Sequence, residues 1–387
     1  MQKREEPEHG NASPISVRSF FWRVDVALAG AVVCAIMGCG ASLENELGLA
    51  TAENVPAQAL VWKSIDGRGF SVWGSGGLFL FGISGPQDGE VVDVWQWSGG
   101  KVVPHRQRYP MSKEGTLALA WLGGQYVAES YKSGDKLVVC RDVTTSNVLK
   151  QWPLTKDWYC DQIHTSRNGR YVAIGVSYDS VRGDGDAWKR VGLIGPEMGE
   201  ITWLPTLGQP PLEFPQLDGD TSLSKVIPSD DGAYVAVAGW RNGAGVYDVR
   251  ANRLLWYTGH PEGEASLDDI AFSPDNKLVY TGGVMGCIYV METATGKILD
   301  RWWMTKSGRD IYGHRIVTVA ASPDGRFVAA GTGPIGLAYV WRASTGERIK
   351  VLNHGGSTIL ILSFSPDSKS LATYAKGQIK VWRMPED

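Results

Sequence analysis

The histidines are the first residues to consider for chemistry, because this side chain is the one most often used for proton transfer and metal binding near neutral pH. Of the six histidines, His260, His314 and His354 recur at a regular spacing, while His105 and His164 lie outside it. A recurring position favours a structural role. No Gly-x-Ser-x-Gly elbow, His-Glu-x-x-His helix or phosphate-binding glycine loop is present. The sequence therefore predicts no catalytic residue, no bound metal and no cofactor.

Two insertions, which contain polar and aromatic residues, interrupt a repeat that runs through the chain. They span 178–190 and 205–222. Their composition, aromatic anchors within a polar rim, is common in protein interfaces, although long loops also tolerate insertion without acquiring a function. The residues expected to bind a partner are Asp179, Arg182, Asp184, Asp186, Trp188, Lys189, Glu213, Phe214 and Asp218.

The aspartates of the first insertion have a second interpretation. Asp179, Asp184 and Asp186 could hold Ca²⁺, which takes several carboxylate oxygens in flexible loops. Their spacing does not match a known calcium loop, so we favour the partner-binding interpretation.

The composition indicates strands joined by tight turns. The 387 residues include 48 Gly and 16 Trp, and only 20% are charged. Glycine supplies the positive φ that tight turns need, and tryptophan suits pleated, half-buried surfaces. The formal net charge of −3 provides no basic stripe to neutralise phosphates, so we expect no binding to nucleic acid.

A repeat runs through the chain, and each unit reads as an apolar strand, a turn and a second apolar strand. The clearest turns contain Ser-Pro-Asp, in which Pro presets φ and Ser and Asp bond to the local backbone. Five of the six spacings between units fall within the period of about 40–50 residues typical of propeller blades. The anchors of the units are Trp73, Trp121, Ser166, Ser229, Ser273, Ser322 and Ser365.

A third and a fourth strand follow each of these pairs, but the chain ends after the third strand of the seventh unit. Residues 57–64 read like the other fourth strands and precede the first unit, so they can complete the last one. The sequence thus predicts an all-β, seven-bladed β-propeller of four-stranded blades over 57–387. Such closure leaves no open sheet at the end of the array.

The resemblance to WD-repeat proteins rests on two recurring features. A Gly-His or Asn-His pair precedes the repeats at His260, His314 and His354, and Trp341 and Trp382 end third strands. In that family the His, an Asp, a hydroxyl and the Trp form a hydrogen-bonded set that stiffens the blade. The resemblance implies this structural role for the five residues.

The chain departs from the family pattern at the aspartate. Met285, Ile335 and Lys376 occupy its position, and Arg342 and Arg383 follow the tryptophans. The chain is therefore similar to divergent, bacterial and exported members of the family.

The N-terminus predicts export. Arg18 and Arg23 precede an apolar run at 26–38, which is the order of a signal peptide. The run ends at Cys39, in a context resembling a bacterial lipobox whose cysteine is lipidated. We expect a signal peptide over 1–39, a linker over 40–56, and a location in the cell envelope, periplasmic or on the outer surface. An ordinary cleaved signal and an uncleaved anchor are the alternatives.

These observations favour a monomeric, non-catalytic platform that binds protein partners through its loop face and meets the membrane only through its N-terminus. Rigid blades would hold the loops in place. The alternatives are an enzyme or ligand-binding propeller with a site at the central channel mouth, and a cytoplasmic scaffold whose N-terminus is not a signal, since a fold alone does not fix a function.

Overall fold

The computed structural model describes much of the chain from Ser71 onward. The chain divides into two compact units, Met1–Leu43 and Glu44–Asp387, and every described residue belongs to the second. Residues 1–39, 40–56 and 57–64, on which the signal, linker and closing-strand predictions fall, lie outside the described residues. The described ranges are 71–73, 78–83, 91–98, 101–110, 116–121, 126–131, 137–142, 145, 147–154, 158–178, 189–205, 223–239, 243–258, 266–305, 314–375 and 378–386.

The described elements are antiparallel strands, which confirms the all-β prediction. In the stretches of chain that the structure describes, no helix is long and apolar enough to cross a membrane. The first strands in chain order are β1 (Ser71–Trp73), β2 (Leu78–Ile83), β3 (Val91–Ser98), β4 (Lys101–Pro110), β5 (Thr116–Trp121), β6 (Tyr126–Tyr131), β7 (Leu137–Asp142), β8 (Val148–Pro153), β9 (Trp158–Thr165), β10 (Val172–Tyr178), β11 (Lys189–Ile194) and β12 (Thr202–Trp203). The later strands are β13 (Leu223–Pro228), β14 (Tyr234–Gly239), β15 (Gly243–Asp248), β16 (Arg253–Thr258), β17 (Leu267–Phe272), β18 (Leu278–Gly283), β19 (Cys287–Glu292), β20 (Ile298–Trp303), β21 (Ile316–Ala321), β22 (Phe327–Thr332), β23 (Leu337–Arg342), β24 (Arg348–Asn353), β25 (Ile361–Phe364), β26 (Ser370–Ala375) and β27 (Gln378–Arg383).

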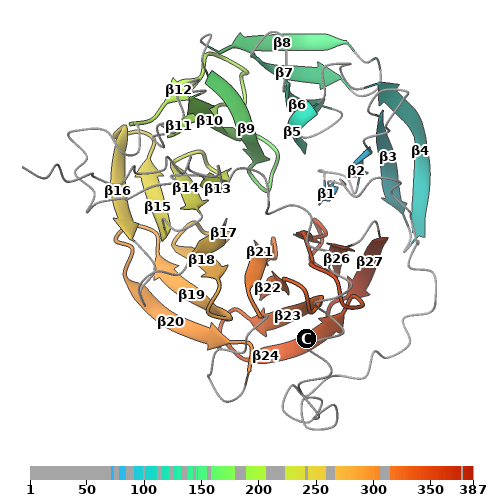
Figure 1. The fold of residues 1–387 in the computed structure, drawn as a ribbon, viewed down its shortest axis with the longest axis vertical. Coiled ribbons are helices and arrows are strands. Elements are labelled where there is room, and N and C mark those ends of the chain that lie inside the picture. The colour runs from blue at the N-terminus through green and yellow to red at the C-terminus, as the bar shows by residue number, and fades with distance from the viewer. Residues whose placement is uncertain are drawn as a thin grey trace, which may run out of the picture. The chain divides into compact units, whose positions relative to one another are not determined.

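Strand order within each sheet follows chain order, as in β5-β6-β7-β8 and β21-β22-β23-β24. Two such groups, β13–β16 and β17–β20, are joined into one sheet by the pairing of Gly239 with Leu267. Figure 1 shows the sheets with their first strands on the inner side and their fourth strands on the outer side. The first strands are neighbours in sequence order, from β5 through β9, β13, β17 and β21 to β25.

The core lies between consecutive sheets. Side chains of β10 and β11, such as Ala173 and Val191, pack with Val226, Val235 and Tyr247 of the following sheet. The second strands β18 and β22 are buried along nearly all or all of their length. Small residues suit them because both of their faces meet a neighbouring sheet.

Fourth strands also hydrogen-bond to the next sheet. The indole N–H of Trp152 donates to the carbonyl of Gly199 at 2.6 Å, and that of Trp256 to Thr293 at 2.7 Å. The ammonium of Lys350 reaches the carbonyl of Arg383 at 3.1 Å. The first two acceptors lie in turns, and Arg383 ends β27, so each bond gives a backbone carbonyl at the end of a strand or in a turn a donor from the neighbouring unit.

One fourth strand is shorter than its counterparts, since β12 contains only Thr202 and Trp203. The backbone N–H of Leu204 still donates to Val191 at 3.0 Å. The next residue, Pro205, has no N–H and cannot continue the ladder. Arg190 covers the exposed side of this short strand, with its guanidinium 4.4 Å from the centre of the Trp203 ring.

Candidate functional site

The predicted partner-binding residues lie outside the described residues, apart from the backbone of Lys189. This residue begins β11 and pairs with Ser177 of β10. The insertion at 178–190 therefore connects the second and third strands of its sheet, as predicted, and that at 205–222 leads from β12 into β13. The residues outside the described ranges are Asp179, Arg182, Asp184, Asp186, Trp188, Glu213, Phe214 and Asp218.

Metal ligands do not gather in the part of the chain that the structure describes. Groups of three or more His, Cys, Asp or Glu able to hold an ion are absent there. The aspartates weighed as calcium ligands, Asp179, Asp184 and Asp186, fall outside that part.

The first strands carry β-bulges at corresponding places. In β13 the register shifts between Leu223 and Lys225, and in β17 between Leu267 and Asp269. A bulge places an extra residue on one strand and redirects the neighbouring side chains. In β17 the consecutive residues Asp268 and Asp269 consequently have different partners.

Asp269 is a buried carboxylate that bonds to both neighbouring first strands. Its Oδ1 lies 2.6 Å from the ammonium of Lys225 on β13 and accepts from its neighbour Ile270 N–H at 2.7 Å. Its Oδ2 accepts the backbone N–H of Val319 on β21, also at 2.7 Å. Buried charges are stable only when paired and hydrogen-bonded. Because both oxygens are occupied, this carboxylate is poorly placed to act as a general base.

Asp268 forms a two-pronged ion pair with Arg315, the residue that precedes β21. The guanidinium Nε and a terminal nitrogen lie 2.5 and 2.8 Å from the two carboxylate oxygens. The side chain of Asp268 is buried, while that of Arg315 is about one-third exposed, at 32%. This geometry gives the pair directional strength beyond its charge, and it links the fifth repeat unit to the sixth.

His164 of β9 extends this polar series, as a residue packed among the inner strands. Its Nε2 lies 3.3 Å from the amide oxygen of Gln162. Burial and, to a smaller degree, the charge of Lys225 lower the pKa of His164 to about 3. The imidazole is therefore neutral at physiological pH and serves as a packed hydrogen-bonding group.

Five described turns, those after β9, β13, β17, β21 and β25, share one hydrogen-bonded design. In each, a serine hydroxyl donates to an Asp or Asn two residues later at 2.6 or 2.7 Å, and the serine oxygen accepts a backbone N–H five residues later. These are the local bonds that the Ser-Pro-Asp pattern predicts. The serines are Ser166, Ser229, Ser273, Ser322 and Ser365, and their partners are Asn168, Asp231, Asp275, Asp324 and Asp367.

These bonds favour the ionised carboxylates. The hydroxyls of Ser273 and Ser365 hold the pKa of Asp275 and Asp367 below the ordinary value. For Asp231, burial raises the pKa, but hydrogen bonds from Ser229 and other groups outweigh it and leave the pKa lowered. These turns thus hold ionised carboxylates that accept hydrogen bonds from nearby side chains and backbone.

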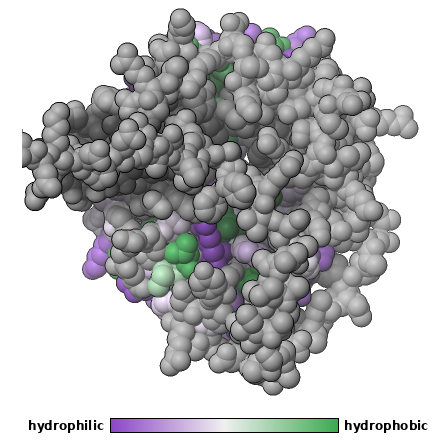
Figure 2. Space-filling model, in the orientation of Figure 1, coloured by the Kyte–Doolittle hydropathy of each residue, from purple (hydrophilic) through white to green (hydrophobic). Residues whose placement is uncertain are grey.

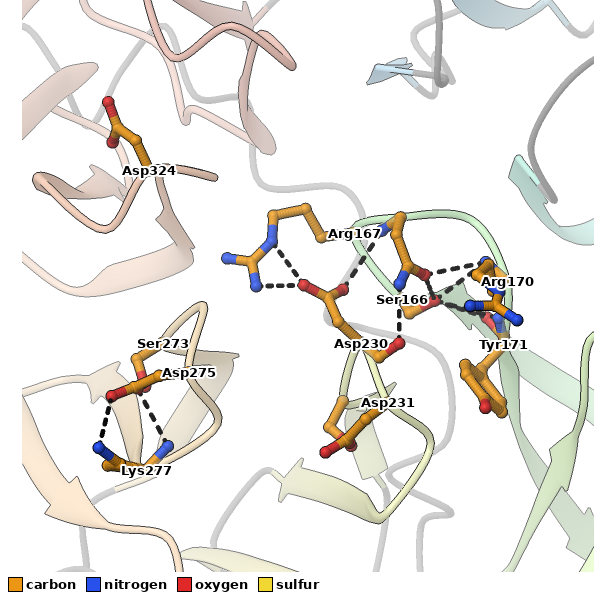
Figure 3. Close-up of polar contacts among 12 residues, drawn as sticks. Ser166, Arg167, Arg170, Tyr171, Asp230, Asp231, Ser273, Asp275, Lys277 and Asp324 are labelled. Atoms are coloured by element: carbon orange, nitrogen blue, oxygen red, sulfur yellow. Dashed lines mark hydrogen bonds and ion pairs between the residues drawn. The ribbon is translucent and has the colours of Figure 1, made fainter.

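Neighbouring turns also contact one another, as Figure 3 shows for Arg167 and Asp230. The Arg167 guanidinium binds the Asp230 carboxylate through two nitrogens, with Nε at 2.9 Å. The side chain of Asn168 donates to the Asp230 carbonyl at 2.7 Å. Farther along, the N–H of Asp324 donates to the Ser368 hydroxyl at 3.1 Å. These bonds connect the ends of consecutive sheets.

The last repeat contains the histidine, hydroxyl and tryptophan expected from the family resemblance. The indole N–H of Trp382 donates to Thr373 Oγ1 at 2.9 Å, and Nδ1 of His354 lies 2.8 Å from the same oxygen. All three side chains are buried. Thr373 joins the loop before β25 to the strands β26 and β27, even though Lys376 stands where the family has aspartate.

The preceding repeat keeps the histidine and the tryptophan but lacks the hydroxyl. Ala330 occupies the position corresponding to Thr373, eight residues after the turn serine. Tyr339 instead lies between them, with its ring centre 6.3 Å from that of His314 and 6.0 Å from that of Trp341. Aromatic contact takes the place of the hydroxyl network here. His260 lies outside the described residues.

The inner-strand network was not predicted from the sequence, although a signal for it exists. Asp268 and Asp269 interrupt the otherwise apolar strand LDDIAF, and Lys225 lies in the corresponding strand of the preceding unit. A charge on a strand that the repeat places in the interior must find a partner. Aligning the repeats on their turn serines would have revealed these residues.

We predict that Thr373→Val lowers the free energy of unfolding by about 2 kcal/mol, since it preserves shape and removes the hydroxyl partner of the buried Trp382 indole N–H and of His354 Nδ1. Urea unfolding followed by tryptophan fluorescence measures the change. Thr202→Val, at an exposed strand position, is the matched control and should change stability by less than about 0.5 kcal/mol. Equal effects of the two variants would contradict the role assigned to the hydroxyl.

Comparison with known proteins adds a family relationship to this geometry. The family model described as WD domain, G-beta repeat matches residues 346–383, the repeat that contains Thr373 and Trp382. The WD repeat-containing protein SL1-17 of Schistosoma mansoni is 31% identical over 140 residues, which cover 35% of this chain and 42% of that protein. The chain thus matches less than half of this relative's length.

A solved structure supports the fold. A chain of the crystal structure of a mitotic checkpoint complex superposes with a TM-score of 0.62 at 17% identity, covering 84% of this chain and 91% of that one. At this identity the similarity concerns the propeller-like fold alone. The matched repeat and the relative show that part of the chain is similar to WD-repeat proteins, and the solved structure shows a propeller-like fold.

Proposed function

We propose that this protein is a non-catalytic platform that binds a protein partner through the connections at 178–190 and 205–222. The observation that carries the proposal is the internal pairing of the charged groups on the frame. Asp269 binds Lys225, Asp268 binds Arg315, and the turn carboxylate of Asp275 accepts the hydroxyl of Ser273. We call the strands and turns with these paired charges the frame. The frame holds the two connections in place, and recognition is left to the side chains of those connections.

Strand geometry supports a shared position for the two connections. Where two repeat units meet, Gly239 at the end of a second strand pairs with Leu267 at the start of the next first strand. The same relation applied one unit earlier brings the end of β10 near the start of β13, which are neighbouring strands. The connections that leave these ends would form one surface with Trp188 and Phe214 as aromatic anchors.

On the face drawn in Figure 2, the coloured, described residues include hydrophobic and hydrophilic side chains that lie close together. A rigid frame would also reduce the entropy lost when a partner binds.

A photo-reactive amino acid at Trp188 or Phe214 should cross-link to the same discrete partner in cells, because both anchors contact it. The matched control places the photo-reactive group at Lys277, whose side chain is 80% exposed in the turn that follows β17, at the opposite end of the strands. Mass spectrometry of the adducts is the measurement. Trp188→Ala should abolish the adduct formed from Phe214, and equal cross-linking from Lys277 would argue against this surface.

We also propose that the sheets are the blades of a closed, seven-bladed propeller in which residues 57–64 are the fourth strand beside β27. Two relations support it. β1 is a neighbour of both β5 and β25, and β27 ends the described order β25-β26-β27. An added strand would protect the open edge of this sheet.

Closure predicts different effects of proline at two nearby positions. Val61→Pro should lower the free energy of unfolding by about 1–3 kcal/mol, because proline removes a ladder hydrogen bond. Ala52→Pro, in the proposed linker, should leave the urea midpoint unchanged. If another segment closes the propeller, the two variants should have the same urea midpoint of unfolding.

We further propose that the protein is exported to the cell envelope and held there as a lipid-anchored monomer through Cys39. The order of basic residues, apolar run and cysteine supports this, since a small number of acyl chains suffices for stable anchoring.

The anchor is tested by intact mass and membrane fractionation in a bacterium with an export pathway. The wild type should lose residues 1–38, gain acyl mass and sediment with the envelope, whereas Cys39→Ala should do none of these. If both proteins remain full-length and soluble, the export proposal fails, and the platform would act in the cytoplasm.

A further inference from the structure

We propose that the Asp269 carboxylate is a conformational coupler that makes the first strands of three neighbouring repeat units open together. A displacement of β13 would be passed through Asp269 to β21, a strand two units farther along the chain. The inference does not depend on the proposed function, because it concerns only the described strands.

The first arm of the coupler reaches β13. The ammonium of Lys225 lies 2.6 Å from Asp269 Oδ1, and the exposed fractions of the two side chains are only 20% and 5%. Lys225 follows the bulge in β13 and is paired with Ala238 on β14. Its side chain therefore moves with the fourth repeat unit.

The second arm reaches β21. The N–H of Val319 donates to Asp269 Oδ2 at 2.7 Å and so points away from its own sheet, where Val319 is paired with Ala330. β21 is the inner edge strand of that sheet, and edge strands leave one row of backbone groups unpaired. Asp269 supplies an acceptor that the sixth unit needs but lacks.

Asp269 is also hydrogen-bonded within its own sheet. Thr281 Oγ1 on β18 donates to the Asp269 carbonyl at 2.8 Å, and the N–H of Ile270 donates to Oδ1. The carboxylate cannot rotate towards one neighbour without weakening its bond to the other. Removing the lysine would leave a buried charge without its counter-ion. A carboxylate that then turns out of the interior to regain solvation would give up its bond to Val319, even though Lys225 does not touch Val319.

A second carboxylate on the same strand offers a matched control. Asp268 binds only Arg315, through two nitrogens, and no bond of its side chain reaches β13 among the described contacts. Its loss should affect the junction of the fifth and sixth units alone. The two adjacent aspartates thus differ in the number of neighbours that they join.

Hydrogen exchange measured by mass spectrometry on the full chain tests the coupling. Lys225→Met should raise the exchange rate of amides in β21, including Val319, by about tenfold, a size typical of coupling between linked sites. Asp269→Asn should raise exchange in both β13 and β21. Asp268→Asn should raise it near Arg315 and leave β13 unchanged.

The proposal is overturned if Lys225→Met accelerates exchange only in β13 and β14. A global loss of structure in this variant would be recognised by uniform acceleration. In that event Lys225→Arg, which keeps the charge, and Lys225→Gln, which removes it, are compared at equal denaturant. Faster exchange of β21 in the glutamine variant than in the arginine variant supports the coupler, and identical β21 exchange in the two overturns it.

Discussion

The hydrogen bond from Val319 to Asp269 meets a constraint at the inner edge of β21. Along that edge this first strand has no further strand of its own sheet to pair with, and a buried backbone N–H cannot remain without an acceptor. A carboxylate on the neighbouring first strand provides it at 2.7 Å, and Lys225 balances the charge. The remaining inner-strand polar groups extend this arrangement, through the Asp268–Arg315 pair and the neutral His164.

The same need for partners is met differently at the ends and the outer side of the sheets. At the ends, each turn supplies its own acceptors, because Ser and Asp side chains bond to backbone within five residues. On the outer side, Trp152 and Trp256 donate to turn carbonyls of the next sheet. Local bonds therefore shape each unit, whereas bonds between units determine how consecutive sheets are held together. Only the second kind can transmit a displacement.

This division bears on function. Inner-strand charges are paired, as in Asp269–Lys225 and Asp268–Arg315, and long connections at 178–190 and 205–222 join strands of the third and fourth units. A frame of this kind suits a display role, and its propeller-like fold and WD-type repeat at 346–383 are consistent with one. The chemistry of recognition would then depend on side chains such as Trp188 and Phe214 and not on the frame.

Much of the frame was predictable from the sequence alone. Apolar segments on either side of a recurring turn placed the strands, and the Ser-Pro-Asp pattern specified turns with local bonds, as at Ser273 and Asp275. The resemblance to WD repeats indicated the set around Thr373, because its members lie at family positions. Tertiary structure alone decided the role of Asp269, whose partner Val319 is 50 residues away. It also decided that Tyr339 occupies the space beside Ala330, where no hydroxyl joins His314 to Trp341. Local bonds are encoded by neighbouring residues, whereas a buried charge acquires its partners only when separate sheets come into contact.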